Sequence, residues 1–430
     1  MSATLILGLM TVLFLFFGYL GVPVAFSLMA GVFVGAAFTD VTFPAIVQKI
    51  FDGMDSEALL AIPFFLLVGE LMSSANVVEK ITRLSLALVG HVRGGLSQVV
   101  TVFSMFFSEM SGSTTADVAV ISRALAGPMK KEGYEPAFIA AIIAAASTIA
   151  ALVPPSITAV VYGAVGNVSI AGLFMAGLVP AAVMALALAA LAVIVGKKIN
   201  PDEAFEHRTP MLKLLGGALV AIIMVAMIGK GVTSGVATST EVSAFAVIYA
   251  LVAGSLAFRE LSVADLGRLF VRSASMAGSI LFIVAAASSL SFALTIEQIP
   301  QLVSGSMVSF AHQYGSTMFI LLSVLLMIVF GAVLEGAPAL IIFGPLLTPI
   351  AQQLGVNPLH FGTVMVIAMG LGLFAPPIGL GLFATCAITG TQVKDVARPM
   401  MKYMAVLLAA LVVLVLVPSF SLWLPTRLGL

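Results

Sequence analysis

Long apolar runs separated by short polar segments follow one another along the chain. The stretch from Ala137 to Gly196 holds no Asp, Glu, Lys, Arg or His. A helix needs about 20 consecutive apolar residues to cross a bilayer, whereas no soluble core needs such a run. The pattern therefore predicts membrane-spanning helices over residues 4–20, 22–38, 58–75, 137–152, 173–196, 214–229, 240–258, 271–296, 316–334, 359–374 and 403–424.

Other apolar segments are interrupted in a way that an ordinary span is not. Gly, Ser, Thr or Pro break residues 95–127 and 335–353, and proline pairs break the segments that begin at Pro154 and Pro376. Proline removes an intrahelical hydrogen bond and clashes with the preceding turn, so two in a row are expected to unwind a helix. These regions predict discontinuous helices and re-entrant hairpins.

Composition supports a polytopic integral membrane protein. Hydrophobic residues make up 61% of the 430 positions and charged residues 9%, where a soluble domain carries about 25% charged residues. A cleaved signal peptide is not expected, because no basic segment precedes Leu5 and the apolar stretch continues past Phe33. The net charge of zero argues against a nucleic-acid partner, and the single cysteine, Cys386, excludes an intrachain disulfide.

Lysine and arginine are concentrated in a few loops, which indicates how the chain is oriented. The basic segments 197–213 and 259–272 are expected in the cytoplasm, whereas the acidic loop 40–57 is expected outside. Counting spans from these loops places both termini outside. The two basic segments mix charges with Leu, Met and Phe at helical spacing, so they are either helices on the membrane surface or plain connecting loops.

An internal repeat is visible in the prolines. Pro136, Pro154 and Pro155 recur as Pro358, Pro376 and Pro377, and all three are displaced by the same offset along the chain. Each copy has the same order of parts: a small-residue break, an apolar segment, a polar turn, a proline, seventeen mostly apolar residues and the Pro-Pro pair. Paired Gly/Pro-interrupted membrane segments indicate a transporter site, commonly at the interface of inverted repeats.

The breaks are where chemistry is expected. Inside a bilayer every backbone polar group needs a partner, so broken helices persist only where protein or water covers them. Freed carbonyls suit hard cations such as sodium, and half-helix N-termini suit a carboxylate. The first break offers hydroxyls and two carboxylates: Ser108, Ser111, Ser113, Thr114, Thr115, Glu109 and Asp117.

The carboxylates have alternative structural roles. Asp117 could cap a helix in its first turn, and Glu109 could reach the membrane surface. Glu335 follows nearly twenty apolar residues and precedes Gly336, which favours a functional role. At the proline pairs, Ser156 and Thr158 lie beside freed carbonyls in one copy, with Gly379, Gly381 and Thr385 in the other; a plain kink is the alternative for both.

These motifs resemble a known family. The sequence Gly112-Ser113-Thr114-Thr115-Ala116-Asp117, with Val153-Pro154-Pro155-Ser156 and Phe374-Ala375-Pro376-Pro377-Ile378-Gly379, resembles the large membrane subunit of TRAP (tripartite ATP-independent periplasmic) transporters over nearly the whole chain. The resemblance implies a sodium-driven elevator transporter of the bacterial inner (cytoplasmic) membrane. It also implies a small four-helix membrane subunit and a periplasmic substrate-binding protein as separate partners, and an organic acid anion as substrate, of the C4-dicarboxylate or sialic acid type.

Carried onto this sequence, the resemblance gives candidate ligands. The substrate residues would be Ser113, Asp117, Ser156 and Glu335. The first break with the segment Pro154 to Thr158 would form one sodium site, and the segment Gly331 to Pro338 with Pro376 to Gly379 would form another. The full sodium set comprises Ser108, Ser111, Gly112, Thr114, Thr115, Pro154, Thr158, Gly331, Gly336, Pro338, Pro376, Gly379 and Thr385. No cofactor other than sodium as coupling ion is expected.

The expected fold is therefore an all-α polytopic membrane protein, an inverted-repeat elevator-type transporter with two re-entrant hairpins and discontinuous helices. Its expected parts are scaffold helices and arm (1–94), transport repeat 1 (95–196), scaffold and surface arm helices (197–315), transport repeat 2 (316–395) and a C-terminal span (396–430). In the expected mechanism the repeats slide against the remaining helices.

Other functions remain open at this stage. A stand-alone ion-coupled secondary carrier or antiporter of the same architecture is compatible with the composition. An intramembrane protease would need a serine–histidine pair or two aspartates at membrane depth, and His312 and His360 lie near span ends. A channel would show a pore-filter repeat, and an ATP-driven pump would show a nucleotide motif; neither is visible in the sequence. No enzymatic activity is expected.

Overall fold

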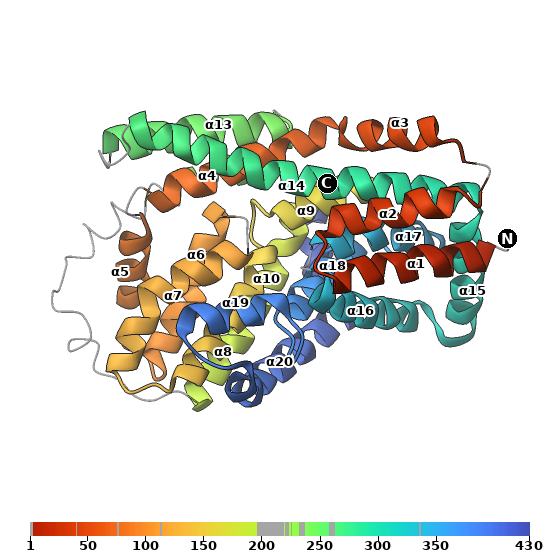
Figure 1. Cartoon of the computed structure of the whole chain (residues 1–430). Helices are drawn as coiled ribbons and strands as arrows, with labels where there is room; N and C mark the ends of the chain where they lie inside the picture. The colour runs from red at the N-terminus through yellow and green to blue at the C-terminus, as the bar shows by residue number, and fades with distance from the viewer. Residues whose placement is uncertain are drawn as a thin grey trace.

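The computed structural model is helical throughout the residues that it describes, namely 3–39, 41–74, 77–111, 114–195, 219, 223–224, 226–231, 237–257, 263–334 and 337–430. Within these ranges, four helices are long and apolar enough to cross a membrane: Ile170–Val195, Asp265–Ile296, Ser316–Val333 and Val393–Leu416. Further apolar helices are shorter, and several of them join end to end across breaks. The prediction of an all-helical membrane protein with several apolar spans is confirmed (Figure 1).

The described residues between 3 and 195 form ten helices and two 3₁₀ turns. They are α1 (Ala3–Tyr19), α2 (Val24–Ala36), α3 (Phe43–Met54), η1 (Glu57–Leu60), α4 (Ala61–Ser74), α5 (Val77–Val89), α6 (Gly95–Ser111), α7 (Thr114–Lys131), α8 (Pro136–Ser147), η2 (Ile149–Ala151), α9 (Ile157–Gly166) and α10 (Ile170–Val195).

The second half repeats much of this order. It contains α13 (Ser239–Val252), the π-helical turn η3 (Ala253–Ala257), α14 (Val263–Ile296), α15 (Ile299–Tyr314), α16 (Ser316–Val333), α17 (Ala337–Gln353), α18 (Pro358–Leu373), α19 (Leu380–Thr389), α20 (Val393–Leu416) and α21 (Ser419–Leu428).

The helix bounds bear out the internal repeat. Helices α6 to α10 correspond one by one to α16 to α20, and the starts of every pair keep the offset of the prolines to within a single position. Both copies place a left-handed residue at the same turns: Gly133 and Gly355 before the third helix, Asn167 and Gly390 after the fourth. The Pro154–Pro155 and Pro376–Pro377 peptide bonds are both cis.

The repeat also extends further than the prolines indicate. Helix α4 is described up to Ser74 and α5 from Val77, on either side of residues that lie outside the description; α14 ends at Ile296 and α15 begins at Ile299, at the offset of the prolines from that place. In Figure 1, α5 and α15 lie at opposite ends of the molecule, and both run across the direction of α14.

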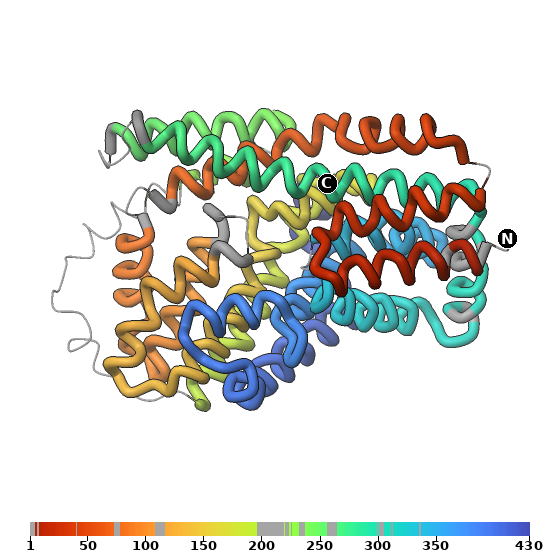
Figure 2. Tube along the Cα trace, viewed as in Figure 1, coloured from red at the N-terminus to blue at the C-terminus, as the bar shows by residue number. Residues whose placement is uncertain are grey.

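Segments of the two copies interlock. Helix α9 packs against α17 and α19 against α7, so the fourth helix of each copy contacts the second helix of the other. Helix α8 also packs against α20 and α10 against α18. Figure 2 shows these parts of the chain side by side in the centre and lower part of the view.

The apolar core has two parts. The main core runs through the repeat helices and includes α4, α13 and parts of α2 and α14, whereas a smaller cluster is formed by α1, α2, α3 and α14 around Met10, Val32, Ile46 and Ala285. Helix α14 is 34 residues long and packs against α2, α3 and α4. Helix α14 thus contributes to both parts of the core.

Two details differ from the sequence-based expectation. Residues 263–272, expected as a separate surface helix or loop, are the first turns of the continuous helix α14. The last span, expected over 403–424, ends at Leu416, because Pro418 disfavours helix in the residue before it, and α21 begins at Ser419. The segment 197–213 lies outside the described residues.

Candidate ion and substrate site at the helix breaks

The first helix break gathers three oxygen atoms. Helix α8 ends at Ser147, the chain continues through η2 and the proline pair, and α9 begins at Ile157. The Ser156 hydroxyl donates to the Ala151 carbonyl oxygen at 2.6 Å, and the Thr158 hydroxyl does so at 3.3 Å. The two hydroxyl oxygens lie 2.8 Å apart. A carbonyl released by the break therefore lies beside two hydroxyls.

Ser156 also caps the N-terminus of the next helix. It is the N-cap of α9, with extended backbone, and its oxygen accepts a hydrogen bond from the Ala159 amide at 3.2 Å. Serine is a preferred N-cap because its oxygen satisfies an amide that the helix leaves unpaired. Ser156 is 1% exposed and Pro154 is buried. The predicted residues Pro154, Ser156 and Thr158 thus form one compact group.

The second break has the same order of helix end, proline pair and helix start as the first, but it lacks the serine and threonine hydroxyls. Helix α18 ends at Leu373 and α19 begins at Leu380, with Gly379 as its N-cap. Gly379 stands where the first copy has Ser156, and it supplies no side-chain cap. A β-carbon there would lie 2.6 Å from the Leu373 carbonyl oxygen and 2.8 Å from that of Ala375. The second break therefore presents backbone oxygens around a position that only glycine fits.

The remaining predicted residues of the second copy lie near this break. Pro376 is half-buried. Thr385 is fully buried in α19, where its hydroxyl donates to the Gly381 carbonyl at 2.7 Å. Gly331 lies in the last turn of α16, and a β-carbon on it would be 2.8 Å from the Met369 carbonyl oxygen. This glycine allows α16 and α18 to approach closely.

The two hairpin tips are only partly described. Gly112, Ser113, Glu335 and Gly336 lie outside the described residues, so their predicted roles stay predictions. Only the backbone is described for four more candidates, which lie at the end of α6 or the start of α7: Ser108, Ser111, Thr114 and Thr115. Pro338 is buried in the first turn of α17.

Asp117 is fully buried in the first turn of α7. A carboxylate there is favoured by the positive end of the helix dipole, and the side chain has an interaction of its own. The position suits helix stabilisation as well as a place near the hairpin tip, so both interpretations of this residue stand.

A buried hydrogen bond joins the two copies near the breaks. The Tyr162 hydroxyl of α9 and the Thr348 hydroxyl of α17 lie 2.7 Å apart, and Thr348 also donates to the Gly344 carbonyl at 2.7 Å. The tyrosine ring lies against Gly362, where a β-carbon would be 2.4 Å from the ring. Sequence reasoning missed Tyr162, because nothing in the pattern distinguishes it from other large core residues.

A second tie links the ends of two helices. The Lys130 ammonium group, in the last turn of α7, donates to the Thr389 carbonyl oxygen at the end of α19, at 3.2 Å. A cation at a helix C-terminus is favoured by the dipole and satisfies a carbonyl that has no intrahelical partner. Together with the Tyr162 contact, it holds the half-helices of the two copies together.

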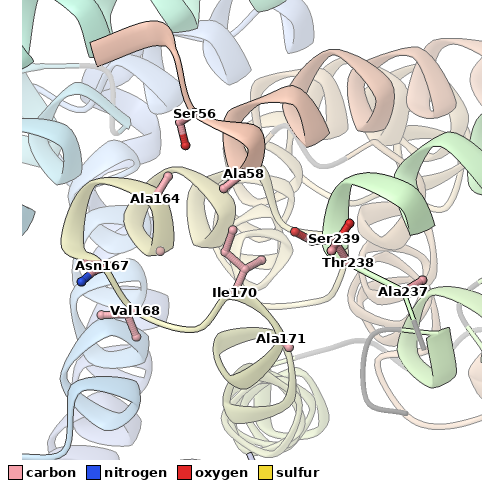
Figure 3. A pocket seen from close by; sticks show the side chains of 11 residues that line it. Ser56, Ala58, Ala164, Asn167, Val168, Ile170, Ala171, Ala237, Thr238 and Ser239 are labelled. Atoms are coloured by element: carbon pink, nitrogen blue, oxygen red, sulfur yellow. The ribbon is translucent and has the colours of Figure 1, made fainter. Parts of the chain in front are cut away.

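Two cavities lie between the repeat helices and the surrounding ones. One, of about 350 Å³, is lined by η1, the α9–α10 turn and the start of α13, with Ser56, Asn167 and Thr238 among its residues (Figure 3). The other, of about 320 Å³, shares Ser56 and Ala164 with it and reaches α14 and α17. Among the described residues, none of the predicted ligands lines either cavity, and both cavities lie at the boundary of the repeat helices.

Several known proteins are similar to this chain in sequence or in structure. The family model described as "Tripartite ATP-independent periplasmic transporter, DctM component" matches residues 11–420. The "C4-dicarboxylate TRAP transporter large permease protein DctM" of Pseudomonas aeruginosa is 34% identical over 385 residues, 89% of each chain. The "Sialic acid TRAP transporter large permease protein SiaM" of Vibrio cholerae is 30% identical, over 95% of each chain.

Among solved structures, the YdaH transporter of Alcanivorax borkumensis superposes with a TM-score of 0.62 and 14% identity. The match covers 95% of this chain and 97% of that one. At this identity the likeness concerns the fold alone.

Proposed function

Because the chain belongs to the DctM-component family of tripartite ATP-independent periplasmic transporters, we propose that it is the membrane transport subunit of a sodium-coupled transporter that imports an organic acid anion. It is a transporter permease and not an enzyme. The observation that carries the proposal is the oxygen cluster of Ala151, Ser156 and Thr158 at a helix break in the interior of the protein.

Sodium is the ion that this cluster suits. Hard cations prefer oxygen ligands, and unwound membrane helices bind sodium through freed carbonyls. The first site uses Pro154 to Thr158 together with the tip between α6 and α7. The second uses the carbonyl-lined break at Gly379 together with Gly331 to Pro338 and Pro376. Sodium at either site would replace the hydrogen bonds that now satisfy these oxygens.

The substrate proposal rests on helix ends. Helices α7, α9, α17 and α19 all begin at a break, and each N-terminus presents free amides and the positive end of a dipole. Such an end favours a carboxylate. The relatives are named for C4-dicarboxylate and for sialic acid, which share a carboxylate. Ser113, Asp117, Ser156 and Glu335 are the residues proposed to meet it.

Movement is proposed between two groups of helices. The repeats, residues 95–196 and 316–395, are joined by the Tyr162–Thr348 and Lys130–Thr389 contacts and would move as one body. The remaining parts, 1–94, 197–315 and 396–430, would form the scaffold and arms. The small hydrophobic cluster of α1, α2, α3 and α14 contains no residue of the repeats, and this cluster and the boundary cavities support the division. The positions of α5 and α15 support an inverted repeat.

The proposed setting follows from the family. A tripartite transporter has two further components, here a small four-helix membrane subunit and a periplasmic substrate-binding protein. The chain would lie in the bacterial inner membrane, with both termini in the periplasm.

Uptake into proteoliposomes tests the proposal. Radiolabelled C4-dicarboxylates and sialic acids are offered with and without an inward sodium gradient, and with and without the two partner proteins. Uptake that requires sodium and both partners supports the proposal and identifies the substrate. Sodium-driven uptake by this chain alone would instead establish a stand-alone carrier, and uptake that is indifferent to sodium would refute the coupling.

A further inference from the structure

An apolar cavity of about 260 Å³ lies between the small hydrophobic cluster and the main core. Its walls come from α1, α2 and α14 on one side, with Met10, Phe14 and Leu290, and from α16 and α17 on the other, with Phe330 and Phe343. Among the described residues that line it, Thr11 is the one polar residue, and it has an interaction of its own.

This lining decides what the cavity can hold. A buried water needs two to four polar partners, and apolar cavities stay dry. An engineered apolar cavity of about 150 Å³ binds benzene, so the space here accommodates a larger apolar group. Empty space of this size is unfavourable because its lining loses contacts. The chemistry therefore favours a hydrocarbon occupant without charge.

The surroundings indicate where such an occupant comes from. On α1, Val12 and Leu15 are 62% and 46% exposed, and on α16, Leu325 and Val329 are 58% and 51% exposed. Exposed apolar side chains on membrane helices face lipid. In a bilayer, the exposed faces of these two helices would contact acyl chains, which are present there at high local concentration.

We propose that the cavity holds an acyl chain of a membrane phospholipid. The chain lies against the Phe330–Phe343 pair, whose ring centroids are 4.7 Å apart, and against Leu290 and Met10 of the other group. Leu334, the last described residue before the second hairpin tip, also lines the cavity. The occupant therefore touches the stem of a hairpin and the neighbouring scaffold at the same time.

A consequence for regulation rests on the proposed function. When the second hairpin moves relative to α1 and α14, the cavity changes shape. A molecule that fits it in the present arrangement binds this state better than the other and stabilises it. The lipid would thus stabilise one arrangement of the moving helices relative to the fixed ones. The size of this stabilisation would depend on the acyl-chain composition of the bilayer.

Photolabelling tests the binding site directly. The full chain is placed in bilayers that contain a phosphatidylethanolamine with a diazirine at the end of one acyl chain, and labelled peptides are mapped by mass spectrometry. Two Leu→Trp variants are compared with the parent: Leu346→Trp fills the cavity from its wall, whereas Leu325→Trp makes the same change on the lipid-exposed face.

The expected result is labelling at Phe14, Phe330 and Phe343 that falls several-fold in Leu346→Trp and is unchanged in Leu325→Trp. Labels confined to exposed positions such as Leu15 and Val329 would overturn the proposal. Cavity labels that persist in a folded Leu346→Trp protein would overturn it too. Labelling needs neither sodium nor substrate nor partners, so this test can fail or succeed independently of the transport proposal.

Discussion

The carbonyl oxygen of Thr148 lies against Gly370, and these two residues occupy equivalent places in the two copies of the repeat. A β-carbon on Gly370 would lie 3.3 Å from that oxygen. A residue near a two-fold axis lies beside its own equivalent, so this contact supports the proposed inverted repeat. The proposed axis would pass between α18 and the end of α8, a few residues before both proline pairs.

Ser156→Ala removes one of the three oxygens at the first break and the cap of α9. Loss of a serine cap costs about 0.5–2 kcal/mol of stability, and we expect a clearly higher sodium concentration for half-maximal uptake. Ser279→Ala, on the exposed face of α14, is the matched control and should leave the sodium dependence unchanged. An unaltered sodium dependence in folded Ser156→Ala would remove this residue from the site.

Tyr162→Phe deletes the hydroxyl that joins α9 to α17. We expect a loss of about 0.5–1.5 kcal/mol of stability, the usual value of one hydrogen bond, because Thr348 keeps its bond to the Gly344 carbonyl. A double-mutant cycle with Thr348→Val, read by thermal unfolding in detergent, isolates the pair. The effects should not add, and strict additivity would show that the contact contributes nothing.

Glycine-to-alanine variants should lower the stability where the glycine is closely packed and raise it where the glycine faces open space. Gly372→Ala places a β-carbon 2.3 Å from the Ile328 carbonyl oxygen, and overpacking of this kind costs about 1–3 kcal/mol. Gly278→Ala in α14 meets nothing within 4 Å and should stabilise by roughly 0.5–1 kcal/mol, since alanine is the better helix former. Melting temperatures in the reverse order would contradict the close α16–α18 packing.

Cross-linking the boundary should stop transport if the repeats move as one body. Ser56 and Ala164 line both boundary cavities from opposite sides (Figure 3). With Cys386→Ala as background, the pair Ser56→Cys and Ala164→Cys, joined by a short bifunctional thiol reagent, should abolish uptake.

The control pair lies within the scaffold. Glu70→Cys and Arg272→Cys replace an ion pair with a 3.1 Å separation between α4 and α14. Because the proposed division places both residues in the scaffold, their cross-link should leave uptake in place. Full uptake with Ser56 and Ala164 joined would contradict the proposed movement.

Much of the fold could be predicted from hydrophobic runs and prolines. The runs predict α1, α2, α10 and α16 closely, and the constant offset between the proline anchors is confirmed by the helix bounds. The repeat of α4–α5 in α14–α15 carries no proline anchors, so it appears only in the structure. Hydropathy misplaces the end of α20, because the apolar run continues past Pro418 although the helix does not.

The candidate site was predictable where it depends on local chain geometry. Proline pairs unwind a helix wherever they occur, so the cluster at Ala151, Ser156 and Thr158 follows from the sequence. The Tyr162–Thr348 contact joins residues 186 positions apart, and such a pairing depends on the packing of whole helices. The roles of Ser113 and Glu335 stay predictions.

The replacement of Ser156 by Gly379 in the second copy has a consequence for mutational scanning. A scan that truncates side chains to alanine will register the first break as a change in ion dependence, because hydroxyls are lost there. At the second break the proposed ligands around Gly379 are backbone oxygens, which every residue type carries. The same scan is expected to record Gly379 only as steric damage, and the Thr385 hydroxyl is the side chain of the proposed second site through which an ion could be detected.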